Sequence, residues 1–215
     1  MIARDGYPWI LTPLAATVAA GLLGVWWLAA LLLLLTAFMV YFFRDPQRDA
    51  PTERDIVISP ADGRVTRVEK ASPSESHSPT IVSIFLSPFD VHINRSPIAG
   101  TVVDVTYTKG RFTSATSDRA SLVNEQNAIT VKSDTMTVVC KQIAGVLARR
   151  IVCWKRAGDV LELGERFGLI KFGSRTDLVL PAEIEILVKP GDRVRGGITL
   201  IGRLMHGRQR AAGGE

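Results

Sequence analysis

Hydrophobic residues divide the chain into two unlike regions. Residues 9–43 contain no charged residue, and such an unbroken apolar stretch is typical of a helical membrane segment. One continuous helix of this length would extend about 50 Å, whereas the hydrocarbon core of a bilayer is about 30 Å thick. Pro13, Gly21 and Gly24 are positions at which the segment can bend. The pattern therefore leaves two alternatives, a single span that leaves part of the run unused or a re-entrant hairpin.

Beyond Pro51 the pattern changes to short runs rich in Val, Ile and Thr, separated by Gly, Pro and Asp. This alternation is typical of an all-β fold. The predicted strands cover residues 64–70, 80–86, 100–107, 128–132, 136–143, 147–154, 183–188 and 198–203. We therefore expect an N-terminal membrane anchor over residues 1–43 and a mainly β domain over residues 44–215.

Two short phrases recur within the β-rich region. Residues 59–65 (SPADGRV) are echoed by residues 96–102 (SPIAGTV), and residues 158–164 (GDVLELG) more loosely by residues 191–197 (GDRVRGG). The phrases resemble the turn-and-strand elements of lipoyl and biotinyl carrier domains. Two copies predict a duplicated barrel-sandwich with pseudo-twofold symmetry. A carrier function is not expected, because neither copy has the modified lysine in its expected hairpin.

The net charge of +5 is distributed unevenly along the chain. Arg44, Arg48 and Arg54 follow the apolar segment, whereas only Arg4 precedes it. Because Lys and Arg are retained on the cytoplasmic side, we expect the β domain to face the cytoplasm at the cell membrane. Cations also accumulate from Lys189 onward. This basic stretch is interpreted as either a membrane-binding tail or a solvated terminus. No nucleic-acid-binding motif accompanies the charge, so nucleic acid is not an expected partner.

Cysteine and histidine are too few and too scattered for a metal site. Cys140 and Cys153 lack CxxC spacing and stand in apolar runs, which predicts reduced thiols packed as small hydrophobic groups. The three histidines, His77, His92 and His206, do not show ligand spacing. No metal is therefore expected.

Three motifs in the β-rich region contain candidate chemistry. They are residues 59–63 (SPADG), 86–95 (LSPFDVHINR) and 170–177 (IKFGSRTD). Each alone has an ordinary explanation: a turn, polar positions on the outer face of a strand, and a loop. Together and in this order, they resemble the short bacterial and archaeal form of phosphatidylserine decarboxylase. The resemblance extends over about residues 42–204.

The resemblance implies a self-cleaving decarboxylase. In that family the serine after the glycine attacks its own backbone and becomes a pyruvoyl group, which makes Ser174 the source of the covalent cofactor and Gly173 the cleavage site. The pyruvoyl group forms a Schiff base with the amine of phosphatidylserine in the membrane and accepts electrons as CO₂ leaves, giving phosphatidylethanolamine. Cleavage would yield residues 1–173 and 174–215, which stay together as a heterodimer; a higher oligomer is left open.

The resemblance also assigns the supporting residues. His92 matches the decarboxylation histidine of the family and Asp62 its relay aspartate. Longer members carry a second histidine three residues later, where this chain has Arg95. Either His92 serves both steps, or Asp62 or a water activates Ser174 while Arg95 supplies charge. Candidates for substrate binding are Arg95, Asn94 and Phe172.

Other functional classes remain as alternatives. A membrane-anchored β-sandwich relative that binds or scaffolds without cleaving itself would keep the same pattern. A pyruvoyl decarboxylase acting on another amine would keep the same chemistry. A zinc peptidase on a duplicated β fold is disfavoured because the histidine ligands are missing.

Overall fold

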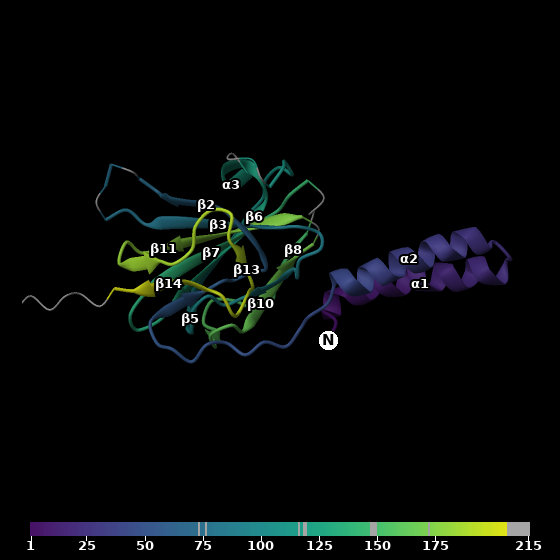
Figure 1. Cartoon of the computed structure of the whole chain (residues 1–215), viewed down its shortest axis with the longest axis horizontal. Coiled ribbons are helices and arrows are strands. Elements are labelled where there is room, and N and C mark those ends of the chain that lie inside the picture. Colours follow the sequence, from purple (N-terminus) through teal and green to yellow (C-terminus); the bar gives the residue numbers. More distant parts are fainter. Residues whose placement is uncertain are drawn as a thin grey trace, which may run out of the picture.

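The computed structural model describes residues 1–72, 74–75, 77–115, 117, 120–146, 150–171 and 173–205 (Figure 1). A helical hairpin projects from one end of a β-rich domain, and the extended chain after the hairpin runs along that domain (Figure 1). Phe172, His206 and the basic tail beyond it lie outside the described residues.

The apolar segment forms two helices, α1 (Tyr7–Leu22) and α2 (Trp26–Phe42), after the 3-10 turn η1 (Arg4–Gly6). Pro8 lies in the first turn of α1, where its missing N–H leaves no hydrogen bond unmade. Gly24 separates the helices with a φ of 74°, a left-handed conformation that glycine adopts without steric cost. The segment is thus a hairpin and not one continuous helix. Among the described residues, no helix combines the length and apolar character needed to cross a membrane.

The two ends of the hairpin meet at the β domain. Ile2 and Arg44 form an isolated antiparallel bridge, and Ala3 N donates to Phe43 O at 2.9 Å. The loop between α1 and α2 lies at the opposite, projecting end (Figure 1). The chain therefore enters and leaves the hairpin on the same side.

Three antiparallel sheets form the β domain within the described residues. The largest curls around the domain with the strand order β13-β2-β3-β11-β7-β6-β5-β9, and the smaller ones are β1-β14-β12 and β4-β10-β8. A short helix, α3 (Ala120–Val123), precedes β6. The strands are β1 (Ile56–Ile58), β2 (Gly63–Lys70), β3 (Thr80–Leu86), β4 (Ile93–Arg95), β5 (Gly100–Thr108), β6 (Gln126–Lys132), β7 (Thr137–Ile143), β8 (Ile151–Cys153), β9 (Val160–Leu161), β10 (Arg166–Ile170), β11 (Ser174–Leu180), β12 (Ile184–Ile186), β13 (Arg193–Val194) and β14 (Leu200–Leu204).

A hydrophobic core fills the space enclosed by the sheets. It contains side chains from all parts of the large sheet, including Val65, Ile129 and Leu178, packed against Val57 of β1 and Ile201 of β14. Every second residue of β6 is buried, as expected for a strand with one face on the core. Cys140 is buried and Cys153 is half-buried, and burial raises the pKa of both thiols.

The repeated phrases make matching contacts. Ser59 and Ser96 each donate a hydroxyl hydrogen bond to the carbonyl two residues on, at 2.7 and 2.6 Å. Gly63 and Gly100 begin β2 and β5 and lie against the adjacent strand so closely that a Cβ would sit 2.1 and 2.3 Å from a carbonyl oxygen. In addition, β13 pairs with β2 as β9 pairs with β5. Residues 59–65 and 96–102 therefore occupy equivalent places near the two ends of the large sheet.

Candidate active site

Ser174 is the first residue of β11, which lies between β3 and β7 in the large sheet. Its side chain is fully buried, and its Oγ has no hydrogen-bond partner among the described residues. Leaving a buried hydroxyl unpaired is unfavourable, and such groups are rare unless chemistry requires them. The hydroxyl that we expect to act as the nucleophile thus makes no hydrogen bond to the described part of the chain.

The peptide bond before Ser174 has an unusual setting. Gly173 adopts a φ of 56°, in the left-handed region that favours glycine. Its carbonyl oxygen packs so closely on Gly145 that a Cβ added there would lie 2.1 Å from it. Two glycines therefore hold this carbonyl, one through its backbone conformation and the other through its lack of a side chain.

Residues 87–92, which we call the His92 loop, are fixed beside this peptide bond. At one end, Leu86 pairs with Ser174 in the β3–β11 ladder. At the other end, Ile170 N donates to His92 O at 3.3 Å. The loop is thus joined to the chain on both sides of Gly173.

The hydrogen bonds of His92 define its protonation. Its Nδ1 lies 2.9 Å from the backbone oxygen of Asp90. Because a carbonyl can only accept, Nδ1 must be the protonated nitrogen and Nε2 carries a free lone pair. Nε2 is buried without a partner among the described residues. Burial lowers the pKa of His92 from 6.5 to about 4, so the imidazole is neutral at pH 7.

The base of the helical hairpin covers His92. The rings of Phe42 and His92 lie with centroids 4.1 Å apart, and Phe42 is only 1% exposed. Two side chains, one in the last turn of α2 and one just after it, also hold the His92 loop: Tyr41 Oη and Arg44 Nη2 both donate to Phe89 O, at 3.2 and 2.7 Å. The hairpin is therefore part of the wall of the site.

Asp62 and Arg95 are engaged elsewhere. Arg48 binds both carboxylate oxygens of Asp62, which also accept from Gly196 N at 2.8 Å. Arg95 donates from Nη2 to Asp45 Oδ1 at 3.3 Å and also binds two backbone oxygens. Both residues thus fasten the chain that follows the hairpin to the β domain, and neither hydrogen-bonds to Ser174 in the described part of the chain.

Asn94 belongs to a chain of buried amides beneath Ser174. Its Nδ2 donates to Thr176 Oγ1 at 3.2 Å, and its Oδ1 accepts from Gln142 Nε2 at 2.9 Å. Gln142 Oε1 in turn accepts from Asn127 Nδ2 at 3.0 Å. The network joins β4, β11, β7 and β6, and it fixes the strand that Ser174 begins. Thr176, Gln142 and Asn127 were not singled out from the sequence, because no local pattern shows that they meet.

An ion pair also anchors the start of β11. Arg175 Nε lies 2.9 Å from Asp177 Oδ1, and both side chains are buried. Arg175 Nη1 donates to the backbone oxygens of Ala115 and Ser117 at 3.2 and 3.1 Å. This ion pair, to which no sequence motif assigns a role, holds the residues after Ser174 in position.

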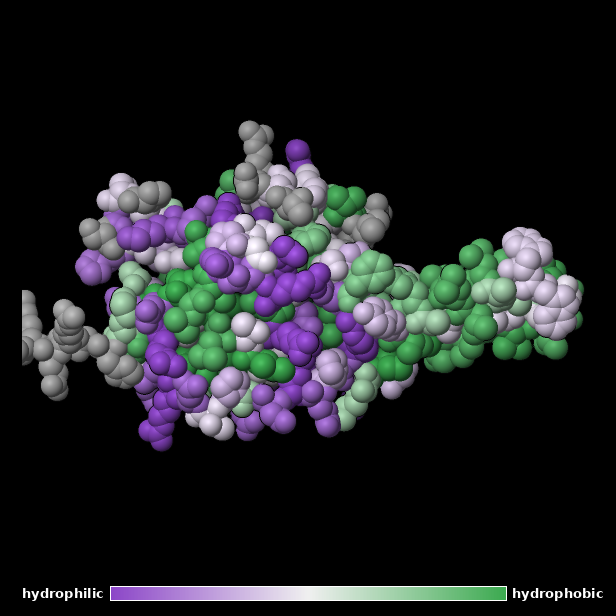
Figure 2. All heavy atoms as spheres, in the orientation of Figure 1, coloured by the Kyte–Doolittle hydropathy of each residue, from purple (hydrophilic) through white to green (hydrophobic). Residues whose placement is uncertain are grey.

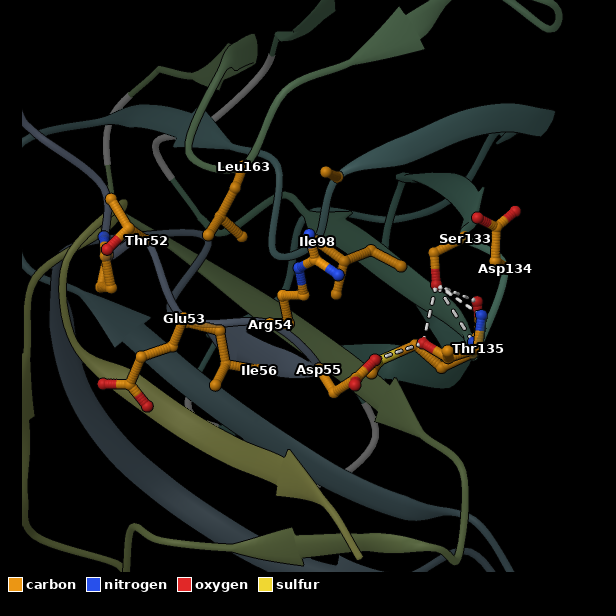
Figure 3. Close-up of a pocket in the computed structure, with 13 residues that line it drawn as sticks. Thr52, Glu53, Arg54, Asp55, Ile56, Ile98, Ser133, Asp134, Thr135 and Leu163 are labelled. Carbon is orange, nitrogen blue, oxygen red and sulfur yellow. Dashed lines mark hydrogen bonds between the residues drawn. The ribbon is translucent and has the colours of Figure 1, made fainter. Parts of the chain in front are cut away.

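Figure 3 shows a hollow formed by another part of the β domain. It measures about 580 Å³ and is lined by residues 51–56 and the turn between β6 and β7, where Thr135 Oγ1 donates to Asp55 Oδ1 at 2.8 Å. That turn is at the far end of β7 from Ile143, the residue that pairs with Arg175. At about 3.3 Å per residue the strand separates the hollow from Ser174 by roughly 20 Å. Among the described residues, no group of His, Cys, Asp and Glu could hold a metal ion.

Comparison with known proteins assigns the chain to a family. The family model described as phosphatidylserine decarboxylase matches residues 35–202. The chain belongs to the phosphatidylserine decarboxylase family. The phosphatidylserine decarboxylase proenzyme of Symbiobacterium thermophilum is 48% identical over 207 residues, 95% of this chain and 96% of the relative. The protein of the same name from Syntrophus aciditrophicus is 45% identical over 205 residues, 94% of this chain and 96% of the relative. The resemblance inferred from three motifs is confirmed.

Proposed function

We propose that this protein is a phosphatidylserine decarboxylase that cleaves itself between Gly173 and Ser174 and converts phosphatidylserine to phosphatidylethanolamine and CO₂. The observation that carries the proposal is the buried, unpartnered Ser174 Oγ directly after a glycine carbonyl held by a second glycine. Family membership supports the substrate, because relatives at 48% and 45% identity are named phosphatidylserine decarboxylase proenzyme.

The residues around Ser174 fit a self-derived pyruvoyl group. Ser174 Oγ attacks the Gly173 carbonyl carbon, so that a C–O bond forms as the C–N bond breaks and an ester replaces the peptide. Loss of the Ser174 Cα proton then expels the carboxylate of Gly173, and water replaces the nitrogen, which leaves as ammonia. When formed, the pyruvoyl group supplies the carbonyl that withdraws electrons during loss of CO₂.

His92 is the proposed base for both steps. The Ser174 hydroxyl lacks an acceptor and the His92 Nε2 lone pair lacks a donor, although the two residues flank the same short segment. A neutral imidazole accepts the serine proton during cleavage. The same nitrogen then returns a proton to the substrate carbon after CO₂ departs. Asp62 and Arg95 act in this account as positioning residues that hold the hairpin over His92.

The hairpin is proposed to insert into the membrane. Its exposed residues are overwhelmingly apolar (Figure 2), with Leu22, Leu23, Trp26 and Trp27 at least 73% exposed, and such a surface is unfavourable in water. A helix of the length of α1 covers only about 24 Å of a hydrocarbon core about 30 Å thick. Since both ends of the hairpin meet the β domain, we infer re-entrant insertion from one side. Arg44 and the cations after it support a cytoplasmic position for that side.

We further infer that the β domain is a duplicated barrel-sandwich. The matching contacts of the two phrases support this inference, as does the strand order, in which β13-β2-β3-β11 mirrors β9-β5-β6-β7. The symmetry axis would then pass between β11 and β7. Ser174 would lie next to that axis, on a strand that is flanked on both sides.

Release of CO₂ from phosphatidylserine tests the function. The purified full-length chain, in nonionic micelles, should release labelled CO₂ from phosphatidylserine labelled in the serine carboxyl group and should accumulate phosphatidylethanolamine. Ser174→Ala should do neither. A self-cleaved protein that leaves phosphatidylserine intact and decarboxylates another amine would refute the substrate assignment, and a protein that is never cleaved would support a binding role.

A further inference from the structure

A second hollow, which we call the junction hollow, lies where the start of the helical hairpin meets the β domain. Its volume is about 430 Å³. It is lined by Arg4, Asp5, Pro8, Trp9, Arg150 and Lys171. None of these residues was assigned a role by the sequence motifs, and none takes part in the proton transfers proposed above.

The junction hollow has an excess of positive charge. Three cations and one carboxylate line it. The carboxylate, Asp5, is already occupied, since its Oδ2 accepts from Trp154 Nε1 at 3.1 Å. Within the described part of the chain, the guanidinium groups of Arg4 and Arg150 form no ion pair. An anion that entered the hollow would therefore meet two unpaired guanidinium groups, which suit phosphate oxygens.

Lys171 brings a buried cation to the same place. Lys171 is only 5% exposed. Its Nζ makes one long hydrogen bond, 3.5 Å to Asp5 O. The rings of Trp9 and Phe43 lie 5.8 and 6.0 Å away. An ammonium has three donors, so most of its capacity is unused among the described residues. Burial lowers the pKa of Lys171, an effect that a bound anion would offset.

The position of the junction hollow links it to both membrane and active site. Trp9, in the first turn of α1, is 45% exposed, and tryptophan in such a place marks the membrane interface. Lys171 precedes Ser174 by three residues, a distance of at most about 10 Å along the chain. We propose that the junction hollow binds the phosphate diester of the phospholipid substrate, with Arg4, Arg150 and Lys171 as its cationic ligands. The proposal rests on the proposed function and names the element that recognises the lipid.

Steady-state kinetics of charge-removing variants test the proposal. Arg4→Gln and Arg150→Gln should each raise the KM for phosphatidylserine in nonionic micelles about fivefold, with a much smaller change in kcat, because one cation near phosphate is lost. Lys171→Met should raise it further. Self-cleavage, followed on a denaturing gel, should go to completion in both arginine variants. Arg156→Gln is the matched control, because this arginine is 91% exposed and outside the hollow, and its KM should stay within twofold of wild type.

Two further measurements separate the possible failures. Soluble glycerophosphoserine should inhibit wild type more strongly than Arg150→Gln, and inorganic phosphate should inhibit neither at the same concentration. Equal inhibition by inorganic phosphate would overturn the lipid assignment, and an unchanged KM in both arginine variants would overturn the site. Binding of phosphatidylethanolamine micelles to uncleaved Ser174→Ala needs no turnover. If the binding weakens when Arg150→Gln is added to Ser174→Ala, the phosphate site in the junction hollow is supported even where the decarboxylation assay fails.

Discussion

At the scale of single residues, the proposed chemistry depends on two atoms that lack hydrogen-bond partners in the described part of the chain. Ser174 Oγ has a proton to give and His92 Nε2 has a lone pair to receive it. The Phe42 ring packs on the imidazole, and the hydrogen bond from Nδ1 to Asp90 O fixes the tautomer. A base that is neutral and already oriented would remove the need for a second histidine, as the proposed mechanism requires.

Replacing His92 tests this interpretation. His92→Gln keeps a planar polar side chain but removes the basic nitrogen, so we expect decarboxylation to fall by at least about 100-fold and self-cleavage to slow as well. His77→Gln is the control, because His77 is exposed and lies outside the site. Release of CO₂ and the fraction of cleaved chain are the two measurements. Normal cleavage in His92→Gln would assign the cleavage base to another group.

The buried imidazole also predicts a pH dependence of stability. The pKa of His92 is about 4 in the folded chain against 6.5 as the reference value. Between pH 6.5 and 4, the folded state therefore binds fewer protons at His92 than the unfolded state does. The free energy of unfolding is highest above pH 6.5 and falls as the pH decreases toward 4. The loss amounts to about 3 kcal/mol. Between pH 7 and 4, denaturant unfolding of Ser174→Ala should lose about that much more stability than Ser174→Ala with His92→Gln; parallel losses would contradict a buried neutral histidine.

At the scale of elements, the hairpin and the β domain are joined more closely than the sequence pattern indicates. The charge-free run ends at Phe43, so the sequence suggests an anchor that can be separated from the catalytic residues. In the structure, Phe42 packs on His92, and Arg44 binds the His92 loop. The base of the hairpin should therefore affect chemistry, whereas its tip should affect only attachment to the membrane.

Paired substitutions at the base and the tip test this division. Phe42→Ala removes a fully buried ring, so it should destabilise the chain by roughly 3–5 kcal/mol and slow self-cleavage. Replacing Trp26 and Trp27 with serine should weaken binding to phospholipid vesicles and leave self-cleavage unchanged, since both are 73% exposed at the far end of the hairpin. Vesicle flotation and gel analysis are the measurements. Equal loss of cleavage in both variants would refute the division.

The strands show what the hydrophobic pattern could predict. Residues 80–86 form β3 with the predicted bounds, and β2, β5, β6 and β7 begin or end within two residues of prediction. The pattern missed β11, the central strand, because Arg175, Thr176 and Asp177 read as a polar loop. Their burial depends on partners that are distant in sequence, such as Asn94 for Thr176. Charged residues indicate a buried strand only when those partners are known.

The same limit applies to the site. Gly173, Ser174 and His92 were identified because a short motif surrounds each of them. The covering role of Phe42 and the engagement of Asp62 by Arg48 could not be predicted. Both depend on how the hairpin returns to the β domain, which no local spacing records.

At the scale of the whole molecule, cleavage would divide the chain without separating its parts. Residues 174–205 supply β11, which pairs with β3 and β7, and β14, which pairs with β1. The side chains of these strands also enter the common core. A small chain interleaved in this way should remain bound after its peptide link to residue 173 is lost, as the proposed heterodimer requires.

The mass of the purified protein tests the central claim most directly. Intact-mass analysis under denaturing conditions should find two chains, residues 1–173 and residues 174–215, the smaller one lighter than its encoded peptide by one ammonia. The smaller chain should also resist Edman sequencing, because a ketone replaces its terminal amine. Ser174→Ala should give one uncleaved chain. An active wild-type enzyme that is a single chain of unmodified mass would contradict self-cleavage and the pyruvoyl mechanism with it.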